Sequence, residues 1–369
     1  MEEHMASHRE MGSFEECSPQ KANNHQILAC MWVFTYKFDK VGYLLKVKAR
    51  LVVRGDQQRK GAVENTYAST LAGKSFRTLI TIAARFDMEL IQYDVVNAFV
   101  HTNIPYDVFM KMPDGYTKKG RILRLRKALY GLRESPLLWQ KDFTTTLKNL
   151  GCEPVPHEPC CWIKDGVIIF FYVDDIVVAF KKGSRQKAEA LMASIKQRYA
   201  LQGGEDLQWF LGVAIVRDRA NRTVYLSQAD YINKLDRFLD GTRGSCSTPM
   251  SNVELLPYEG KASREEITNY QQITGSILYA AVFTRPDVAF AVSRLARFNL
   301  NPGPKHLTAA DRAIRYLLST SNYALKLGGG DTFETWTDAS FADNTVDRRS
   351  LQAYVTKLFG GAIGWRANK

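Results

Sequence analysis

The sequence lacks several features that mark special classes of protein. Its six cysteines are scattered, which indicates reduced thiols in an intracellular protein rather than a disulfide scaffold. The first 16 residues are polar and acidic and contain no apolar signal core. The longest apolar run, residues 167–173, is far shorter than the ~20 residues that cross a membrane. We therefore expect a globular intracellular protein with no membrane partner.

Negative charge is also scarce. The 369 residues include 50 Lys and Arg against 38 Asp and Glu, which gives a formal net charge of +12. Such a surplus suits a polyanionic partner, because each neutralised phosphate releases counterions. Charge alone fits equally well a basic protein with no nucleic-acid role. The length predicts two or three domains, and 45% apolar residues provide ample material for their cores.

Basic residues follow a predicted β-hairpin near the N-terminus. Two β-type runs, residues 31–38 and 44–54, are joined by residues 39–42, which include a glycine, and this pattern is typical of a hairpin. Many of the basic residues alternate along the strands, so they can share one face. They are Lys37, Lys46, Lys48, Arg50 and Arg54. Without a function, this would be a solvated strand face.

Helical and β patterns are mixed along the rest of the chain. The periodicity between residues 127 and 150 is helical, and it predicts core positions at Leu132, Leu138, Phe143 and Leu147. Residues 228 to about 327 are mostly helical, and the three glycines at 328–330 predict a flexible joint. A strand restarts at Phe333. The sequence therefore predicts an α+β fold.

Two adjacent carboxylates, Asp174 and Asp175, lie between apolar runs that predict a buried hairpin. Carboxylates ~5 Å apart repel by roughly 3 kcal/mol at an effective dielectric constant near 20, and partial desolvation adds several kcal/mol more. This is large against a total stability of about 5–15 kcal/mol. A divalent cation is the simplest compensation, and hard oxygen ligands select Mg²⁺ or Mn²⁺. The alternative is a solvated Asp pair at a tight hairpin tip.

A third carboxylate, Asp94, follows a predicted strand at residues 89–93. Alone, it would be interpreted as a cap or a surface residue. Together with the Asp174–Asp175 pair and the basic hairpin, it meets the requirements of two-metal phosphoryl transfer. In that chemistry, ions ~3.5–4 Å apart activate a 3′-hydroxyl and stabilise the leaving pyrophosphate.

These residues resemble a known family. Residues 172–175, Tyr-Val-Asp-Asp, are similar to the catalytic hairpin of reverse transcriptases, and residues 94–99 are similar to their first palm motif. Four further segments, at residues 48–55, 127–136, 210–212 and 284–287, occur in the order found in copia-type LTR-retrotransposon polyproteins. The similarity runs from about Trp32 to the end of the sequence. The ordered set is far more specific than Tyr-x-Asp-Asp alone.

The resemblance implies a right-hand polymerase. Residues 1–30 would be an N-terminal extension, residues 31–250 the reverse transcriptase fingers and palm, and residues 251–328 a helical thumb or connection. Residues 331–369 are similar to the start of an RNase H domain, with Asp338 as its first carboxylate. RNase H needs further acidic residues on later elements, which do not appear before Lys369, so we expect no RNase H activity.

The resemblance also assigns roles to single residues. Asp94, Asp174 and Asp175 would bind two Mg²⁺ ions, with Mn²⁺ as an alternative and the backbone carbonyl of Val95 as a further ligand. Lys37 and Arg50 would grip the incoming triphosphate, since a planar Arg fork matches phosphate oxygens.

Further roles concern the sugar, the base and the primer. Phe99 would be the steric gate against a ribose 2′-hydroxyl, although aromatic residues beside a sheet are as often plain core. Tyr130 and Gly131 would lie under the nucleotide and template, because glycine allows close backbone approach. Phe210, Leu211 and Gly212 would form part of the primer grip; without the resemblance they are a buried strand with a glycine.

Several positions depart from the family pattern. Glu134 stands where Gln is usual, Leu137 where Arg is usual, and residues 351–353 replace Thr-Ser-Gly. Glu134 adds a negative charge near the predicted nucleotide-binding helix, which argues against efficient turnover.

Three functions compete at this stage. The first is an RNA-directed DNA polymerase that uses dNTPs on an RNA or DNA template–primer, in a cytoplasmic virus-like particle or the nucleus. The second is a catalytically inactive nucleic-acid-binding remnant of such an element. The third is a palm-domain nucleotidyl transferase or cyclase without a template, against which the net charge of +12 counts. The sequence leaves the oligomeric state open.

Overall fold

The computed structural model describes residues 1–38, 43–59, 66–239, 241, 244–341, 348 and 350–368. These residues form two compact units built from interleaved segments. The first consists of Met1–Leu71, Ile91–Val178 and Gly183–Glu205, and the second of Ala72–Leu90, Ala179–Lys182 and Asp206–Lys369. Helices and mostly antiparallel sheets occur in both, so the predicted α+β fold is confirmed. The four-part division into extension, fingers and palm, thumb, and RNase H fragment stays a prediction.

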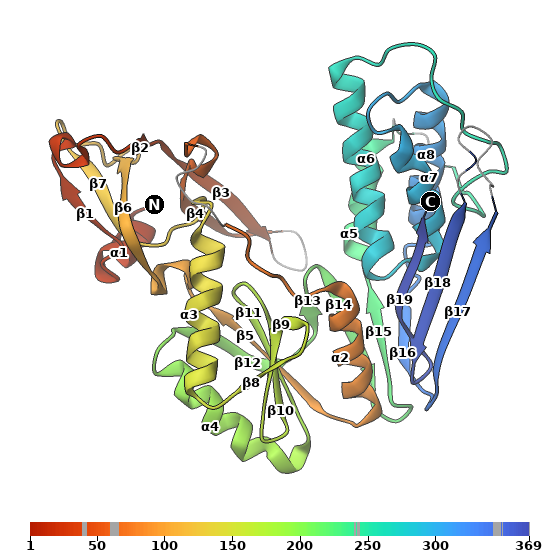
Figure 1. Ribbon diagram of the computed structural model, residues 1–369, viewed down its shortest axis with the longest axis horizontal. Coiled ribbons are helices and arrows are strands. Elements are labelled where there is room, and N and C mark those ends of the chain that lie inside the picture. The colour runs from red at the N-terminus through yellow and green to blue at the C-terminus, as the bar shows by residue number, and fades with distance from the viewer. Residues whose placement is uncertain are drawn as a thin grey trace. The chain divides into compact units, whose positions relative to one another are not determined.

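A six-stranded sheet, which lies largely in the first unit, carries the predicted carboxylates. Its strand order is β12-β5-β11-β10-β9-β8, and its strands are found beside helices α3 and α4 in the lower part of Figure 1. The apolar residues of β11 are buried, because this strand has neighbours on both sides. The strand bounds are β5 Glu89–Val95, β8 Glu153–Val155, β9 Glu158–Lys164, β10 Val167–Tyr172, β11 Asp175–Phe180 and β12 Leu201–Asp206.

Two helices belong to the same unit, α3 (Ser135–Asn149) and α4 (Arg185–Lys196). The expected helical stretch from residue 127 is too long, since its first residue ends strand β7 and Gly131 has a φ of +94°. Three of the predicted core positions, Leu132, Phe143 and Leu147, are buried as expected, and the fourth is not. Leu138 is half-buried, whereas its neighbour Trp139 is only 1% exposed.

A second sheet of the first unit has the order β1-β7-β6-β2. Its strands are β1 (Phe14–Cys17), β2 (Ile27–Leu28), β6 (Asn103–Lys111) and β7 (Ile122–Lys127). Helix α1 (Glu2–Glu10) contributes Met5 to the apolar cluster that also contains Met110 and Leu123. The first residues of the chain are therefore part of a packed core.

The predicted basic hairpin forms a two-stranded ribbon of β3 (Cys30–Phe38) and β4 (Leu44–Val53). Its register pairs Val33 with Arg50, Thr35 with Lys48, and Lys37 with Lys46, so the basic positions share one face, as expected. The other face is apolar and includes Phe34, which is 51% exposed, and Tyr36, which is 61% exposed. The predicted turn at residues 39–42 lies outside the described residues.

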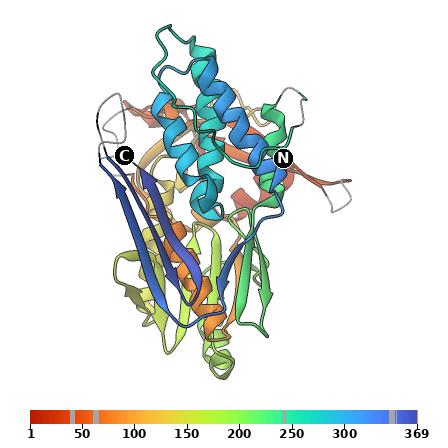
Figure 2. The same cartoon turned by 90° about the vertical axis from the view of Figure 1, so that its right-hand side faces the viewer.

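Three helices form the core of the second unit. They are α6 (Arg264–Phe283), α7 (Ala289–Leu295) and α8 (Pro304–Ser319), which pack together through buried residues such as Ile277, Leu295 and Ile314 (Figures 1 and 2). Helix α6 begins with a capping box, because the Ser263 hydroxyl accepts from the Glu266 N–H and the Glu266 carboxylate accepts from the Ser263 N–H. The other helices of the unit are α2 (Gly73–Arg85) and α5 (Ala229–Asn233).

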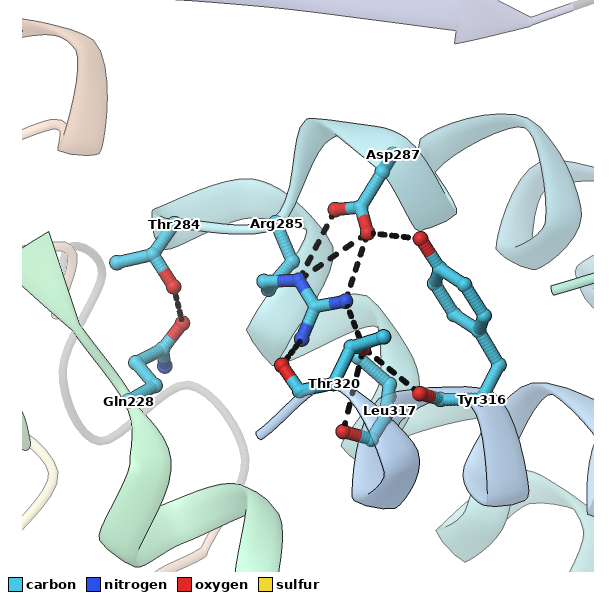
Figure 3. Close-up of polar contacts among 7 residues, drawn as sticks. All are labelled: Gln228, Thr284, Arg285, Asp287, Tyr316, Leu317 and Thr320. Carbon is cyan, nitrogen blue, oxygen red and sulfur yellow. Dashed lines mark hydrogen bonds and ion pairs between the residues drawn. The ribbon is translucent and has the colours of Figure 1, made fainter. Parts of the chain in front are cut away.

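The family-like segment at residues 284–287 stabilises this helical core (Figure 3). Arg285 is 2% exposed and donates to the Asp287 carboxylate from Nε at 3.0 Å and from Nη2 at 2.7 Å. Its Nη1 donates to the carbonyl oxygen of Thr320 at 3.0 Å, and the Tyr316 hydroxyl donates to Asp287 at 2.8 Å. Burial raises the pKa of Asp287, but the bonds and charge of Arg285 outweigh it, and the net shift is downward. The segment therefore holds α7 and α8 together.

The second unit also contains two small sheets (Figure 2). One has the order β13-β14-β15-β16, with β13 Trp209–Phe210, β14 Val213–Asp218, β15 Thr223–Ser227 and β16 Leu325–Gly328. The other has the order β17-β18-β19, with β17 Phe333–Ser340, β18 Leu351–Leu358 and β19 Gly361–Asn368.

The expected flexible joint at residues 328–330 is wrong. Gly328 pairs with Thr223, Gly329 N–H donates to the Arg222 carbonyl at 3.1 Å, and Gly330 N–H donates to the Phe359 carbonyl at 2.9 Å. A Cβ on Gly328 would lie 2.4 Å from the Arg222 oxygen, so the glycine serves close packing of two backbones. Over the described part of the chain, no helix combines the length and apolarity that a membrane crossing requires.

Candidate active site

Asp174 and Asp175 occupy the predicted hairpin between β10 and β11. Val173 and Asp174 form its turn, and Asp175 is the first residue of β11. The strands on either side are apolar and largely buried, whereas both carboxylates are half-buried. The hairpin that the sequence predicts is confirmed, with its two acidic side chains at the tip.

Asp94 lies on the neighbouring strand. β5 is next to β11 in the sheet, and the N–H of Val95 donates to the carbonyl oxygen of Asp174 at 2.9 Å. Val95 is 1% exposed, whereas Asp94 is exposed. Asp94, which precedes the Asp174–Asp175 pair by about eighty positions in the sequence, therefore lies beside that pair at one end of the two strands.

The pKa of Asp175 is affected by the other negative charges near the hairpin. Burial raises the pKa of Asp175, and although a hydrogen bond from the Gln92 amide opposes this shift, the charges of Asp174 and Asp94 add to it. The Gln92 amide nitrogen lies 3.2 Å from Asp175 Oδ1. Burial and the two neighbouring carboxylates thus act on the pKa of Asp175 in the same direction.

The donor set fits a hard divalent cation, since carboxylate oxygens are the ligands that Mg²⁺ prefers. In the side-chain orientations of the described residues, however, no three or more His, Cys, Asp and Glu side chains form a group that could hold a metal ion. Asp175 is hydrogen-bonded to Gln92 instead. Shared coordination of an ion would therefore require other orientations of the Asp side chains.

Arg50, Tyr130 and Phe99 lie in the same neighbourhood. Burial raises the pKa of Tyr130 to about 12, the charge of Asp174 adds to the shift, that of Arg50 opposes it, and that of Asp94 raises it further. The Phe99 ring packs edge-on against the Tyr130 ring, with centroids 4.7 Å apart, and Phe99 is 7% exposed. The basic ribbon, the aromatic pair and the carboxylates thus form one electrostatic environment.

The backbone of Gly131 packs closely against the backbone of the segment at Val53 and Gly55. A Cβ at this position would lie 2.0 Å from the carbonyl oxygen of Val53, and one on Gly55 would lie 2.0 Å from the carbonyl oxygen of Gly131. These contacts join the base of the ribbon to the Tyr130 segment. The need for glycine therefore has a structural cause, independent of any nucleotide.

The other predicted site residues are placed as follows. Lys37 pairs with Lys46 in the ribbon register, but its side chain lies outside the described part. Phe210, Leu211 and Gly212 belong to the second unit, where the Tyr279 hydroxyl donates to the Leu211 carbonyl at 2.6 Å. Asp338 is exposed on β17, also in the second unit. The primer-grip and RNase H roles stay predictions.

Two further residues support this region: Trp139, which no sequence pattern indicates, and Glu134, which the sequence marks only as a departure from the family pattern. The indole Nε1–H of Trp139 donates to the carbonyl oxygen of Val173 at 2.7 Å. Glu134 is 1% exposed, and its carboxylate accepts from the Gln58 amide at 3.0 Å. It also bonds the hydroxyl of Tyr106, whose pKa is raised by burial and by the Glu134 carboxylate. The replacement of Gln by Glu at position 134 indicated that this position is unusual. No pattern in the sequence indicated that Trp139 would donate a hydrogen bond to the Val173 carbonyl.

Comparisons with known proteins identify the family of the chain. Residues 19–252 match the family model described as reverse transcriptase (RNA-dependent DNA polymerase). The whole chain is 33% identical to a stretch covering 29% of the retrovirus-related Pol polyprotein from transposon TNT 1-94 of Nicotiana tabacum. It is 32% identical to the corresponding polyprotein from transposon RE1 of Arabidopsis thaliana, over 95% of this chain and 24% of that protein. The chain thus spans less than a third of the length of these polyproteins.

Two further proteins are similar over different extents. A putative transposon Ty5-1 protein of Saccharomyces cerevisiae is 30% identical over 75% of this chain and 92% of its own length. A solved foamy viral protease–reverse transcriptase in complex with double-stranded DNA aligns with a TM-score of 0.49 at 14% identity, covering 98% of this chain and 54% of that one. By its family match and its transposon relatives, the chain belongs to the reverse transcriptase (RNA-dependent DNA polymerase) family, and its copia-type resemblance is confirmed.

Proposed function

We propose that the chain is an RNA-directed DNA polymerase that adds dNTPs to a primer 3′-end on an RNA or DNA template. The observation that carries the proposal is the bond from Val95 N–H to the Asp174 carbonyl, which sets Asp94 beside the Asp174–Asp175 hairpin. The net charge of +12 and the shared basic face of the ribbon add support for a nucleic-acid partner.

In the proposed reaction, the primer 3′-oxygen forms a bond to the α-phosphorus of the dNTP while the bond to the departing pyrophosphate breaks. Asp94, Asp174 and Asp175 would hold two Mg²⁺ ions, or Mn²⁺ in their place, with the Val95 carbonyl as a further ligand. When bound, such ions favour ionisation of the 3′-hydroxyl and neutralise charge on the phosphates.

The chain's other residues would bind and orient the substrates. Arg50 and Lys37 occupy positions on the basic face of the ribbon and would contact the triphosphate, for which the guanidinium fork is well shaped. Tyr130 and Phe99 would form the floor and the sugar gate of the nucleotide site. Because their rings already pack against each other, the gate would be rigid before substrate binds.

Primer extension by the purified chain tests the proposal, with Asp174→Asn as the decisive variant. We expect this variant to lose at least about 100-fold in extension rate, while its template–primer affinity stays within about 3-fold, because phosphate contacts dominate binding. Asp165→Asn is the matched control: it removes the same charge from the exposed turn between β9 and β10, at the other end of strand β10.

The outcomes separate the candidate functions. Extension that survives Asp174→Asn would contradict the assignment of the hairpin, as would a large loss of template–primer binding in that variant. Wild-type protein that binds template–primer and extends nothing would support the inactive nucleic-acid-binding remnant. Nucleotide turnover without a template would support the palm-domain transferase or cyclase.

A further inference from the structure

The turn that carries Asp174 and Asp175 has a backbone conformation that its residues do not favour. Val173 has a φ of +57°. A β-branched residue in this left-handed region is an outlier, because its side chain crowds its own backbone. The Tyr-Val-Asp-Asp turn contains no glycine that could relieve the crowding. Contacts from outside the hairpin must therefore stabilise the turn.

Two successive carbonyl groups of the turn accept hydrogen bonds from other segments. The N–H of Val95 in β5 donates to the Asp174 oxygen at 2.9 Å, and the indole Nε1–H of Trp139 in α3 donates to the Val173 oxygen at 2.7 Å. The first bond comes from the backbone and is available to any residue but proline. The second depends on the identity of one side chain.

Trp139 is held so firmly that its donor points in one direction. The residue is 1% exposed, its ring stacks on Phe143 at 5.3 Å, and the Tyr199 ring packs edge-on against it at 5.2 Å. Tyr199 is itself fixed, because its hydroxyl bonds Asp142 and Thr146 of α3 at 2.7 Å each. Because Phe143 and Tyr199 pack against the indole ring, they set the direction of its N–H, and the Val173 carbonyl accepts along that direction.

We propose that Trp139 is a positioning residue of the active site. Its indole N–H fixes the Val173–Asp174 peptide, and thereby the direction in which Asp174 and Asp175 present their carboxylates to metal ions. This inference rests on the proposed function. A tryptophan that served only the core would stabilise the first unit without changing the cation affinity of the carboxylates, and this difference can be measured.

The chain offers a matched control for removal of the indole donor. Trp162 in β9 belongs to the same sheet and is 7% exposed, and its Nε1–H donates to the Pro159 carbonyl at 3.0 Å. Trp139→Phe and Trp162→Phe therefore each delete one indole–carbonyl bond, and only the first bond is at the turn. Replacement of Trp139 by 3-benzothienylalanine keeps the ring shape and puts sulfur in place of the N–H, so the donor is lost while packing is kept even if Trp139→Phe folds poorly.

Two measurements distinguish a positioning role from a packing role. The first is the affinity for Mn²⁺ alone, measured by electron paramagnetic resonance. The second is the Mg²⁺ concentration for half-maximal primer extension. For Trp139→Phe and the benzothienyl protein we expect about 10-fold weaker Mn²⁺ binding, a similarly higher Mg²⁺ requirement and about 10-fold lower kcat, since small misplacements of reacting groups are costly. Template–primer Kd and dNTP KM should stay within about 3-fold.

Trp162→Phe should match the wild type in both measurements. Unchanged Mn²⁺ affinity in the benzothienyl protein would overturn the inference, as would an equal change in Trp162→Phe. Asp174→Asn must weaken Mn²⁺ binding. If its Mn²⁺ affinity equals that of wild type, the cation binds elsewhere and the inference fails. The Mn²⁺ measurement needs no catalysis, so wild-type protein that binds Mn²⁺ but extends no primer would contradict the proposed function alone.

Discussion

The peptide N–H of Val53 donates to the carbonyl oxygen of Tyr130 at 2.8 Å, which fastens the base of the β3–β4 ribbon to the segment of the proposed nucleotide site. The next residue, Gly131, has a φ of +94°, and a Cβ there would lie 2.0 Å from the Val53 oxygen. The position of Arg50, three residues before Val53, therefore depends on this contact between two backbones.

We predict that Gly131→Ala lowers the free energy of unfolding by about 3 kcal/mol or more, because strain at positive φ adds to a clash with backbone atoms. Gly120→Ala is the control: its φ is +67°, but a Cβ added there would have no other atom within 4 Å. It should cost about 1–2 kcal/mol from backbone strain alone. Urea unfolding measures both, and equal losses would show that the Val53 contact is not tight.

Phe99→Val should weaken discrimination against ribonucleotides. The smaller side chain opens the space beside the Tyr130 ring, so we expect the preference for dNTPs over NTPs, measured as a ratio of kcat/KM values, to fall at least about 10-fold. Phe109→Val, in the β1-β7-β6-β2 sheet of the same unit, is the packing control, since Phe109 is 1% exposed. Lower stability with unchanged sugar selectivity in Phe99→Val would make Phe99 a plain core residue.

Arg285→Met should destabilise the chain by about 1.5–3 kcal/mol, because it removes the charge-assisted bonds of Arg285, whereas the Asp287 carboxylate keeps access to water. The double variant Arg285→Met/Asp287→Asn removes the charge as well and should recover part of that loss. Thermal and urea unfolding of wild type, Arg285→Met, Asp287→Asn and the double variant measure the coupling free energy between the two side chains. Additive losses would mean that the two side chains do not interact energetically.

The same pair predicts a pH dependence. The pKa of Asp287 is lowered in the folded chain, so its contribution is fully present above the ordinary Asp pKa of about 3.9 and is lost as pH falls below that value toward the folded pKa. In Arg285→Met the bonds and charge that lower the pKa of Asp287 are gone, so this pKa should return toward its ordinary value, and acidification below about pH 4 should narrow the stability gap to wild type. A gap that stays constant between about pH 6 and pH 3 would contradict this linkage.

His8 predicts a second pH dependence, in the first unit. It is 1% exposed and bonds Ser13 at 2.9 Å and His4 at 3.0 Å, and burial followed by the charge of His4 lowers its pKa from 6.5 to about 4. Between these values the unfolded chain takes up a proton that the folded chain resists. Stability should therefore fall by about 2 kcal/mol from this group between pH 7 and pH 5.

His8→Gln should remove that part of the pH dependence, which urea unfolding at the two pH values measures. His25→Gln is the control, since His25 is exposed and should leave the dependence unchanged. If His8→Gln loses as much stability on acidification as wild type, the ring is already protonated or accessible in the folded chain.

Local sequence patterns predict those elements whose structure depends mainly on residues nearby in the sequence. The apolar runs around Asp174 and Asp175 specify a hairpin, and alternation specifies the basic face of the ribbon. Strand β7 alternates leucine and arginine, which is also typical of a strand, but its pairing with β1 and β6 joins segments that no local pattern links. The glycines at 328–330 resemble a linker because the close approach of Arg222 and Phe359 comes from distant segments. The Trp139–Val173 bond joins residues 34 positions apart, and no local pattern encodes such a partner.

The buried Glu134 carboxylate has an evolutionary consequence. A carboxylate brings only acceptors, so it depends on the donors that Gln58 and Tyr106 supply. A glutamine at this position would bring its own amide donors and would suit neighbours that accept. Substitutions at positions 58, 106 and 134 should therefore covary among relatives, with an acidic residue at 134 retained only in lineages that keep a donor at both of the others.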